Sequence, residues 1–461
     1  MGGVFISALH KSSGKTSISI GIAASLKARG LTVQTYKKGP DYIDAMWLTL
    51  AGGRPCRNLD YHTMSPALIR NYYREHADYS NMNLVEGNKG LFDGVDVAGT
   101  DSNAALAKLL DLSVVLVIDT RGMTRGIAPV IQGYIAFDHD IRIAGIILNQ
   151  VGGVRHESKL RAALEYYTDV RVIGAVGRHS EMAIAERHLG LVPANEAAEA
   201  ETIVEQARRA LEEGVDVASL EGIACVTEKP PIPLEPRMSF LRPKIRIAVA
   251  QDAAFGFYYP DDLEAMRSGG AEIVPFDTLR DNKLPECDGL FIGGGFPETQ
   301  AAKLSANMSL RQNIREAIGH GLPTYAECGG LMYLSNSINW RGEMFPMIGV
   351  IPGDVVMQSK PVGRGYVRLK HTGLLPWPGI EKNLDIAAHE FHYGALKNLP
   401  DNSEFAYNVT RGYGIDGYHD GLIIGNTLST FSHHRNIGGN NWVEHFLSFV
   451  REILSEKRGA S

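Results

Sequence analysis

The sequence has few cysteines, no excess of positive charge and no long apolar run. Its four cysteines are scattered along 461 residues without C-x-x-C spacing, which argues against a cysteine-type metal site and suits a reducing cytoplasm. The net charge of −6 provides no basic surface for nucleic acid. Residues 1–8 lack the length and basic flank of a signal peptide, and no apolar run approaches membrane-spanning length. We therefore expect a cytoplasmic protein that binds neither nucleic acid nor membrane.

The chain has the composition of a globular protein with more than one domain. Hydrophobic residues make up 44% of it, and its length predicts two or three domains. A proline-dense stretch at 229–243 cannot form a regular helix or a central strand, so it should act as a semi-rigid spacer. We predict a first domain at 1–228, a linker at 229–243 and a second domain at 244–461.

A phosphate-binding loop is predicted near the N-terminus. A buried strand at 4–7 precedes Gly14-Lys15-Thr16, and a helix is predicted over 17–29. Backbone N–H groups would bind the phosphates of ATP, Lys15 would reach the terminal phosphates, and Thr16 would hold Mg²⁺. Leu9 occupies the usual first glycine position, so an ordinary turn is the alternative. The predicted ATP-binding residues are Ser12, Ser13, Gly14, Lys15, Thr16 and Asn149.

Acidic and amide side chains follow several predicted strands of this half. Strands are expected at 31–36, 83–86, 114–119, 143–149 and 170–176, with helical patterns between them, which predicts a doubly wound, mostly parallel sheet. Ligands bind beyond the carboxyl ends of such strands, and one or two carboxylates suffice for Mg²⁺. Any single acid could instead cap a turn. We assign Asp44 and Glu86, with Thr16, to the metal.

The second half contains a candidate nucleophile in a strand–turn–helix context. A strand at 322–326 and Glu327 lead into Cys328, Gly329 and a second glycine, and a helix follows at 331–334. A new helix N-terminus favours the nucleophilic thiolate, although most lone cysteines are buried and inert. A further glycine run at 293–295 could direct backbone N–H groups at an oxyanion, or could be a plain flexible loop. Strands at 245–250, 272–276 and 289–292 and a helix at 261–269 predict a second doubly wound α/β domain.

Taken together, these motifs resemble known families. The Cys328 segment resembles the elbow of class I glutamine amidotransferases. Three segments, Lys38–Asp44, Arg54–Asp60 and Glu86–Gly94, resemble the cobyrinic acid a,c-diamide synthase family, whose ATPase half is similar to dethiobiotin synthetase. The resemblance covers essentially the whole chain. Here Ala8 and Ser12 replace two of the family's loop glycines, and Asn88 and Lys89 alter the Glu86 loop.

The resemblance implies a glutamine-dependent, ATP-driven amide ligase that needs Mg²⁺. Its partners would be ATP, glutamine and a cyclic tetrapyrrole. The expected tetrapyrrole is a corrin, cobyrinic acid, whose a and c acetate groups would be amidated through an acyl phosphate. A homodimer is possible. Substrate-binding residues would be Lys38, Asp41, Tyr42 and Asp93. Two alternatives stay open: a relative that amidates sirohaem, nickel-sirohydrochlorin or a similar macrocycle, and a non-catalytic nucleotide-binding regulator.

The resemblance also assigns the glutaminase residues. Gly425–His433 matches the family's C-terminal segment and makes His433 the base for Cys328, with the adjacent His434 as the alternative. Many class I enzymes carry Glu two residues after this histidine; Arg435 stands there, so we expect a Cys–His dyad. Oxyanion and glutamine contacts are expected from Gly294, Gly295, Gly329 and Tyr366, the last in a tight loop with Gly365. The segment His389–Tyr393 is also typical of the family, and either a structural or substrate-side role or a catalytic role is expected for it.

Overall fold

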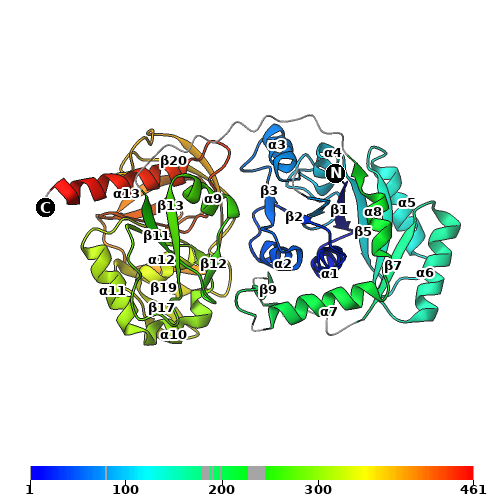
Figure 1. The fold of residues 1–461 in the computed structure, drawn as a ribbon, viewed down its shortest axis with the longest axis horizontal. Helices are drawn as coiled ribbons and strands as arrows, with labels where there is room; N and C mark the ends of the chain where they lie inside the picture. The colour runs from blue at the N-terminus through cyan, green and yellow to red at the C-terminus, as the bar shows by residue number, and fades with distance from the viewer. Residues whose placement is uncertain are drawn as a thin grey trace. The chain divides into compact units, whose positions relative to one another are not determined.

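The computed structural model describes residues 2–77, 80–178, 186–187, 190–197, 199–226 and 244–459. The predicted linker at 229–243 lies outside these residues. The chain divides into two compact units, Met1–Leu234 and Glu235–Ser461, each of which is α/β (Figure 1). Within the described residues, no helix is both long and apolar enough to cross a bilayer.

The first unit is built on a parallel sheet with strand order β3-β2-β4-β1-β5-β6-β7, to which β10 adds one antiparallel strand beside β1. Its strands are β1 (Gly2–Ala8), β2 (Val33–Lys38), β3 (Arg57–Leu59), β4 (Met82–Glu86), β5 (Ser113–Asp119), β6 (Ile143–Val151), β7 (Val172–Gly177) and β10 (Cys225–Val226). Two short strands, β8 (Glu186–Arg187) and β9 (Gly190–Leu191), pair separately. The central strand β5 is an unbroken apolar run from Val114 to Ile118, as expected where helices cover both faces.

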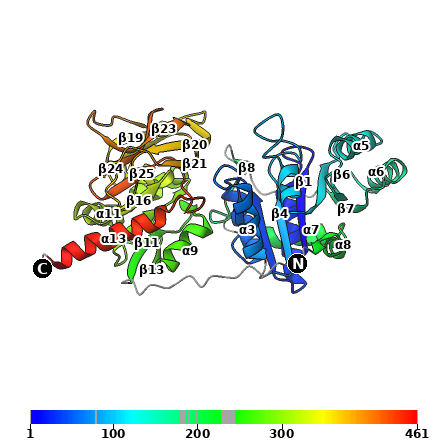
Figure 2. The same cartoon turned by 90° about the horizontal axis from the view of Figure 1, so that it is seen from above.

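Helices cover both faces of this sheet (Figure 2). They are α1 (Lys15–Ala28), α2 (Ile43–Gly52), α3 (Pro66–Ala77), α4 (Asn103–Leu109), α5 (Ile127–Phe137), α6 (Val154–Tyr167), α7 (Ala200–Glu212) and α8 (Val217–Ile223). Residues of α1, α2, α7 and α8 share one apolar core with β1 and β5. Helices α5 and α6 lie side by side outside that core. The strand order reverses at β1, between β4 and β5, and this is where an open parallel sheet binds its ligand.

The second unit is built on a nine-stranded mixed sheet with order β13-β11-β14-β16-β25-β24-β23-β20-β21. The first four pairs in this order, β13-β11, β11-β14, β14-β16 and β16-β25, are parallel. The other four pairs are antiparallel. These strands are β11 (Ile245–Ala250), β13 (Ala271–Phe276), β14 (Gly289–Ile292), β16 (Thr324–Glu327), β20 (Gly363–His371), β21 (Asp385–His392), β23 (Glu404–Arg411), β24 (His419–Ile424) and β25 (Thr427–Thr430). The predicted α/β class is confirmed for both units, and the antiparallel extension is what the sequence analysis did not anticipate.

The remaining elements of the second unit complete two helical layers and two smaller sheets, β12-β15 and β18-β17-β19-β22. The smaller strands are β12 (Phe255–Phe257), β15 (Gly294–Gly295), β17 (Ser335–Trp340), β18 (Glu343–Pro346), β19 (Ile351–Met357) and β22 (Gly394–Lys397). The helices are α9 (Pro260–Ser268), the 3₁₀ helix η2 (Pro297–Gln300), α10 (Ala301–Ala306), α11 (Met308–Gly319), α12 (Gly329–Leu334) and α13 (Trp442–Gly459). One apolar core holds α10, α11 and α12, and a second core holds α9 and α13 on the other side of the parallel strands.

Candidate active site

The phosphate-loop segment connects β1 to α1 at the switch point of the first sheet. Gly14 caps α1 with φ +83°, and a Cβ there would lie 2.2 Å from Asn149 Nδ2, so both conformation and space require glycine. Asn149, near the end of β6, donates from Nδ2 to the Ser13 carbonyl at 2.9 Å. Ser13 Oγ in turn donates to the His10 carbonyl at 2.8 Å, and Ser12 has φ +64°. The residues predicted to bind ATP therefore form one connected loop.

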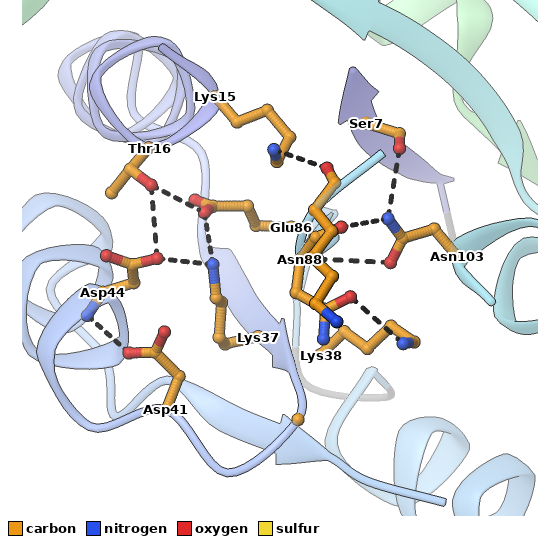
Figure 3. A network of polar contacts seen from close by, with 12 residues as sticks. Ser7, Lys15, Thr16, Lys37, Lys38, Asp41, Asp44, Glu86, Asn88 and Asn103 are labelled. Atoms are coloured by element: carbon orange, nitrogen blue, oxygen red, sulfur yellow. Dashed lines mark hydrogen bonds and ion pairs between the residues drawn. The ribbon is translucent and has the colours of Figure 1, made fainter. Parts of the chain in front are cut away.

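A buried charge cluster lies directly beside this loop (Figure 3). The Thr16 hydroxyl is 2.9 Å from Glu86 Oε1 and 3.2 Å from Asp44 Oδ2. The same two carboxylate oxygens lie 2.6 Å and 2.5 Å from Lys37 Nζ. Lys15, the first residue of α1, donates to the Lys89 carbonyl at 2.7 Å. The structure thus brings together the three residues that the sequence analysis assigned to the metal, although they come from three separate elements.

Lys37 belongs to this cluster, and the sequence analysis assigned it no role. Burial alone would lower the pKa of Lys37, but the carboxylates of Asp44 and Glu86 raise it well above its usual value, so the side chain stays charged. Burial, followed by the charge of Lys37, lowers the pKa of Lys15 to about 8. Lys37 is the next-to-last residue of β2 and lies directly opposite Glu86 in the parallel neighbour β4, a register that only the folded sheet shows.

The cluster has the chemistry that Mg²⁺ requires. Two carboxylates and a hydroxyl converge at one place, and Glu86 Oε2 is buried without a hydrogen-bond partner among the described residues. Hard divalent cations prefer such oxygen ligands, and Mg²⁺ commonly completes its shell with water and phosphate. Across the part of the chain that the structure describes, no group of three or more His, Cys, Asp or Glu side chains forms a separate metal site. Thr16, Asp44 and Glu86 therefore fit a phosphate-associated Mg²⁺.

The predicted macrocycle contacts lie around the same centre. Asp41 Oδ1 accepts the Asp44 N–H at 2.9 Å, and burial together with the Asp44 carboxylate raises the pKa of Asp41 to about 7. Tyr42 is buried at the start of α2. Lys38 Nζ donates to Asn88 Oδ1 at 3.1 Å, and the exposed Asp93 accepts the Gly90 N–H at 2.9 Å. Lys38 and Asp93 therefore hold the loop that follows Glu86.

Asn103 also holds that loop, and the sequence analysis did not single it out. Its amide donates to the carbonyls of Asn88 and Gly90, the latter at 2.8 Å, and its Oδ1 accepts the Asn88 N–H at 3.2 Å. Figure 3 shows this side chain next to Ser7, on the opposite side of the loop from Lys37. An asparagine at the start of a helix is usually a cap, so nothing in the sequence distinguished it.

The second centre is built on Cys328, at the turn between β16 and α12. Cys328 has φ +47°, which is unusual for a residue with a side chain and is typical of strained nucleophile elbows. Its N–H donates to the Thr430 carbonyl at 2.7 Å, which ties the elbow to the end of β25. Because β16 and β25 are parallel neighbours, both carry the segments that follow them to the same edge of the sheet.

His433 reaches Cys328 for that reason, only three residues beyond the end of β25. Its imidazole hydrogen bonds Cys328, and its Nδ1 lies 3.6 Å from Glu327 Oε2. Burial alone would lower the pKa of His433, but Cys328 and then Glu327 raise it to about 10. The neighbouring His434 instead places its ring against Tyr407, and burial lowers its pKa. The geometry therefore distinguishes the two histidines in favour of His433.

Glycines let the backbone approach this pair. A Cβ on Gly294 would lie 2.5 Å from His433 Cε1, and a Cβ on Gly329 would lie 3.1 Å from the Gly295 nitrogen. Strand β15, which holds Gly294 and Gly295, therefore packs directly against the elbow. These are the positions from which backbone N–H groups could stabilise an oxyanion next to the thiol.

The expectation for Gly365 and Tyr366 is partly wrong. They form no tight loop but lie within β20, where Gly365 pairs with Glu390 and Tyr366 with His389 of β21. The glycines suggested a turn, yet this strand needs small residues because a Cβ on Gly363 would lie 2.3 Å from His392 Nε2. Tyr366 still neighbours the site, since His389 stacks on the His433 ring at 4.9 Å.

Arg435 stands where many related enzymes carry glutamate, and its charge is matched elsewhere. Its Nε donates to Asp261 Oδ2 at 2.8 Å, and its guanidinium lies over the Tyr259 ring at 5.2 Å. The acid beside His433 is instead Glu327, which immediately precedes the nucleophile. Its position in a short strand gave no signal of this role.

Comparison with known proteins agrees with both centres. Residues 5–192 match the CobQ/CobB/MinD/ParA nucleotide binding domain, and residues 246–440 match the CobB/CobQ-like glutamine amidotransferase domain. A cobyrinate a,c-diamide synthase of Magnetococcus marinus is 44% identical over 97% of this chain and 97% of its own length. Synthases of the same name from Methanosarcina acetivorans (41%, covering 93% of this chain and 91% of that protein) and Methanosarcina barkeri (39%, covering 98% and 97%) are also similar. With two matching domains and near full-length similarity, the chain belongs to the cobyrinate a,c-diamide synthase family.

Proposed function

We propose that this chain uses ATP and glutamine to convert the a and c acetate carboxylates of cobyrinic acid into amides. The observation that carries the proposal is the presence of two equipped centres in one chain. The first is a phosphate loop whose Thr16 lies against two buried carboxylates. The second is a thiol on a strained elbow, hydrogen bonded to a buried imidazole. A decayed, non-catalytic regulator would have no reason to keep both.

In the first unit, the chain's own residues would activate the substrate carboxylate. A carboxylate oxygen attacks the γ-phosphorus of ATP, ADP leaves, and an acyl phosphate remains. Lys15 would bind the terminal phosphates, and Lys37, which pairs with both Asp44 and Glu86, offsets part of the repulsion between the two acids. Bound Mg²⁺, held by Thr16, Asp44 and Glu86, would supply positive charge toward the phosphate oxygens. Lys38, Asp41, Tyr42 and Asp93 are the proposed macrocycle contacts.

In the second unit, the Cys328–His433 pair would release ammonia from glutamine. The thiol proton passes to His433, the thiolate attacks the amide carbon, and the imidazolium returns a proton to the departing ammonia. Backbone N–H groups of the Gly294–Gly295 and Gly329 segments would stabilise the oxyanion. Water, activated by His433, then hydrolyses the thioester to glutamate and free thiol. Ammonia displaces phosphate from the acyl phosphate and forms the amide.

The test is an incubation of the purified chain with ATP, Mg²⁺ and glutamine labelled in its amide nitrogen. The panel contains cobyrinic acid, sirohaem and nickel-sirohydrochlorin, and mass spectrometry counts the nitrogens gained by each. We expect two labelled amides on cobyrinic acid. Labelling of another macrocycle alone would reassign the substrate within the family, and no amide on any macrocycle would refute the proposal.

A further inference from the structure

The carboxylate of Glu327 is held more firmly than a structural role at the end of a strand requires. It is the last residue of β16 and its side chain is buried. Oε1 accepts the Tyr325 hydroxyl at 2.6 Å and the His434 N–H at 2.9 Å. Both fixed donors lie on Oε1, so Oε2 is directed to His433 Nδ1, 3.6 Å away.

Among the described neighbours of His433, Glu327 is the acid placed to accept a hydrogen bond from Nδ1. Cys328 hydrogen bonds the imidazole, His389 of β21 stacks on one ring face, and Gly294 of β15 lies against Cε1. Tyr259 reaches this group through His389, with its hydroxyl 3.3 Å from His389 Nδ1. Arg435, at the position where related enzymes carry a glutamate, is cationic and paired with Asp261.

A histidine that takes a thiol proton needs its second nitrogen fixed. When Nδ1–H is donated to a carboxylate, the ring is held in the tautomer that presents Nε2 to the nucleophile, and the imidazolium that forms is stabilised. A separation of 3.6 Å is an ion-pair distance rather than a full hydrogen bond. Such contacts are often long in ligand-free enzymes and shorten when substrate binds.

We propose that Glu327 is the positioning residue of the glutaminase centre, in which its carboxylate accepts Nδ1–H of His433 and replaces the acid that the Arg435 position lacks. The proposal rests on the proposed glutaminase function and adds a third member to the expected pair. The residue that orients the base comes from the strand of the nucleophile rather than from the segment of the histidine. One short strand thereby positions two of the three groups.

The test compares Glu327→Gln with the wild-type chain in glutamine hydrolysis and in ammonium-dependent amidation. Glutamine keeps the size of the side chain and an oxygen for the Tyr325 and His434 donors, but it removes the charge. We expect kcat/KM for glutamine to fall on the order of a hundredfold or more, as for loss of a base-orienting acid. Amidation with ammonium should persist, because the first unit is unchanged.

The pH profile separates positioning from structural support. The imidazolium must protonate the departing ammonia, so activity is lost as pH rises through the pKa of His433. Glu327 raises that pKa, and its neutralisation should move the alkaline limb of the glutaminase rate to lower pH. Glu327→Asp keeps the charge, so its alkaline limb should lie between the limbs of Glu327→Gln and wild type. A merely structural glutamate would change the amount of folded protein and leave the limb in place.

Glu390 provides a matched control in the same unit. It is also buried, accepts two backbone N–H groups at 2.7 and 2.8 Å, and lies 3.6 Å from a histidine, His392. That histidine bonds the Gly394 carbonyl and stacks on Phe431. Glu390→Gln should lower the thermal unfolding temperature, because two buried N–H groups lose a charged acceptor, and should leave the alkaline limb of the glutaminase rate in place.

Each outcome has one interpretation. If wild type releases no glutamate, the proposed function fails and Glu327 is not the cause. If wild type is active and Glu327→Gln matches it, the inference is wrong while the glutaminase stands. Equal losses with glutamine and ammonium would make Glu327 a folding residue, and this also overturns the inference.

Discussion

Replacing Gly294 with alanine should disable the glutaminase centre selectively. The added Cβ would lie 2.5 Å from His433 Cε1 and 3.2 Å from the Phe257 Cβ. Carbon atoms rest at about 3.5–4.0 Å, so the ring must move by roughly 1 Å. Such a movement of the His433 ring is hindered, because the ring is buried and stacked on His389. A displacement of about 1 Å in a catalytic group typically costs on the order of a hundredfold in rate.

The assay for Gly294→Ala measures glutamate release and ammonium-dependent amidation on the same preparation. We expect the first to fall about a hundredfold and the second to remain. Gly319→Ala is the control: Gly319 ends α11, and apart from the adjoining backbone of its own helix no heavy atom of the described residues lies within 4 Å of its Cβ position. Glutamate release from Gly294→Ala within about threefold of wild type would refute the packing argument. Loss of both activities together would show a folding defect instead.

Four further predictions follow from the two centres. Cys328→Ala should abolish amidation with glutamine but keep it with ammonium, as measured by amide formation; failure with both donors in a folded variant would contradict the assignment. Lys15→Ala should lose on the order of a thousandfold with either donor, measured as ADP release, and near-normal turnover would argue against the phosphate loop. Glu86→Gln should reduce Mg²⁺-dependent amidation far more than glutamine hydrolysis, and a parallel loss would make Glu86 structural. The pKa of His433 is raised from 6.5 to about 10, so the stability that its protonation contributes is complete below pH 6.5 and is lost as pH rises toward 10. The thermal unfolding temperature of wild type should fall over this pH range, and Cys328→Ala should make that fall smaller.

Local patterns predicted much of the framework. The apolar run at 114–118 became β5 with both faces covered, and Gly14-Lys15-Thr16 became the loop and the first turn of α1. The small residues after Glu327 became the elbow. These features depend on residues close in sequence, where a strand period, a glycine and a helix start act together. The antiparallel strands β20 to β24 were not predicted, because strand formation depends on packing against neighbouring strands as much as on the local residue pattern.

The partners within each site were harder to predict. Lys37 carried no predicted role, and only its register opposite Glu86 makes it the counter-ion of the acidic pair. Gly365 suggested a turn, but in β20 it meets a neighbouring strand. The usual spacing places the third group of the Cys328 centre two residues after His433, where Arg435 stands. The acid of this centre is supplied by another strand, a position that the usual spacing after the histidine does not indicate.

The sequence by itself determined the chemistry that each unit can carry: a phosphate loop, acids at strand ends, and one thiol between a strand and two glycines. Those residue types suffice for phosphoryl transfer and for nucleophilic attack wherever the fold places them. The tertiary structure alone decided which groups act together. Parallel pairing of β16 with β25 brings Glu327, Cys328 and His433 to one sheet edge, and pairing of β2 with β4 brings Lys37 to Glu86. Catalysis depends on separations of a few ångströms, and these are set by long-range strand pairing that the local sequence does not encode.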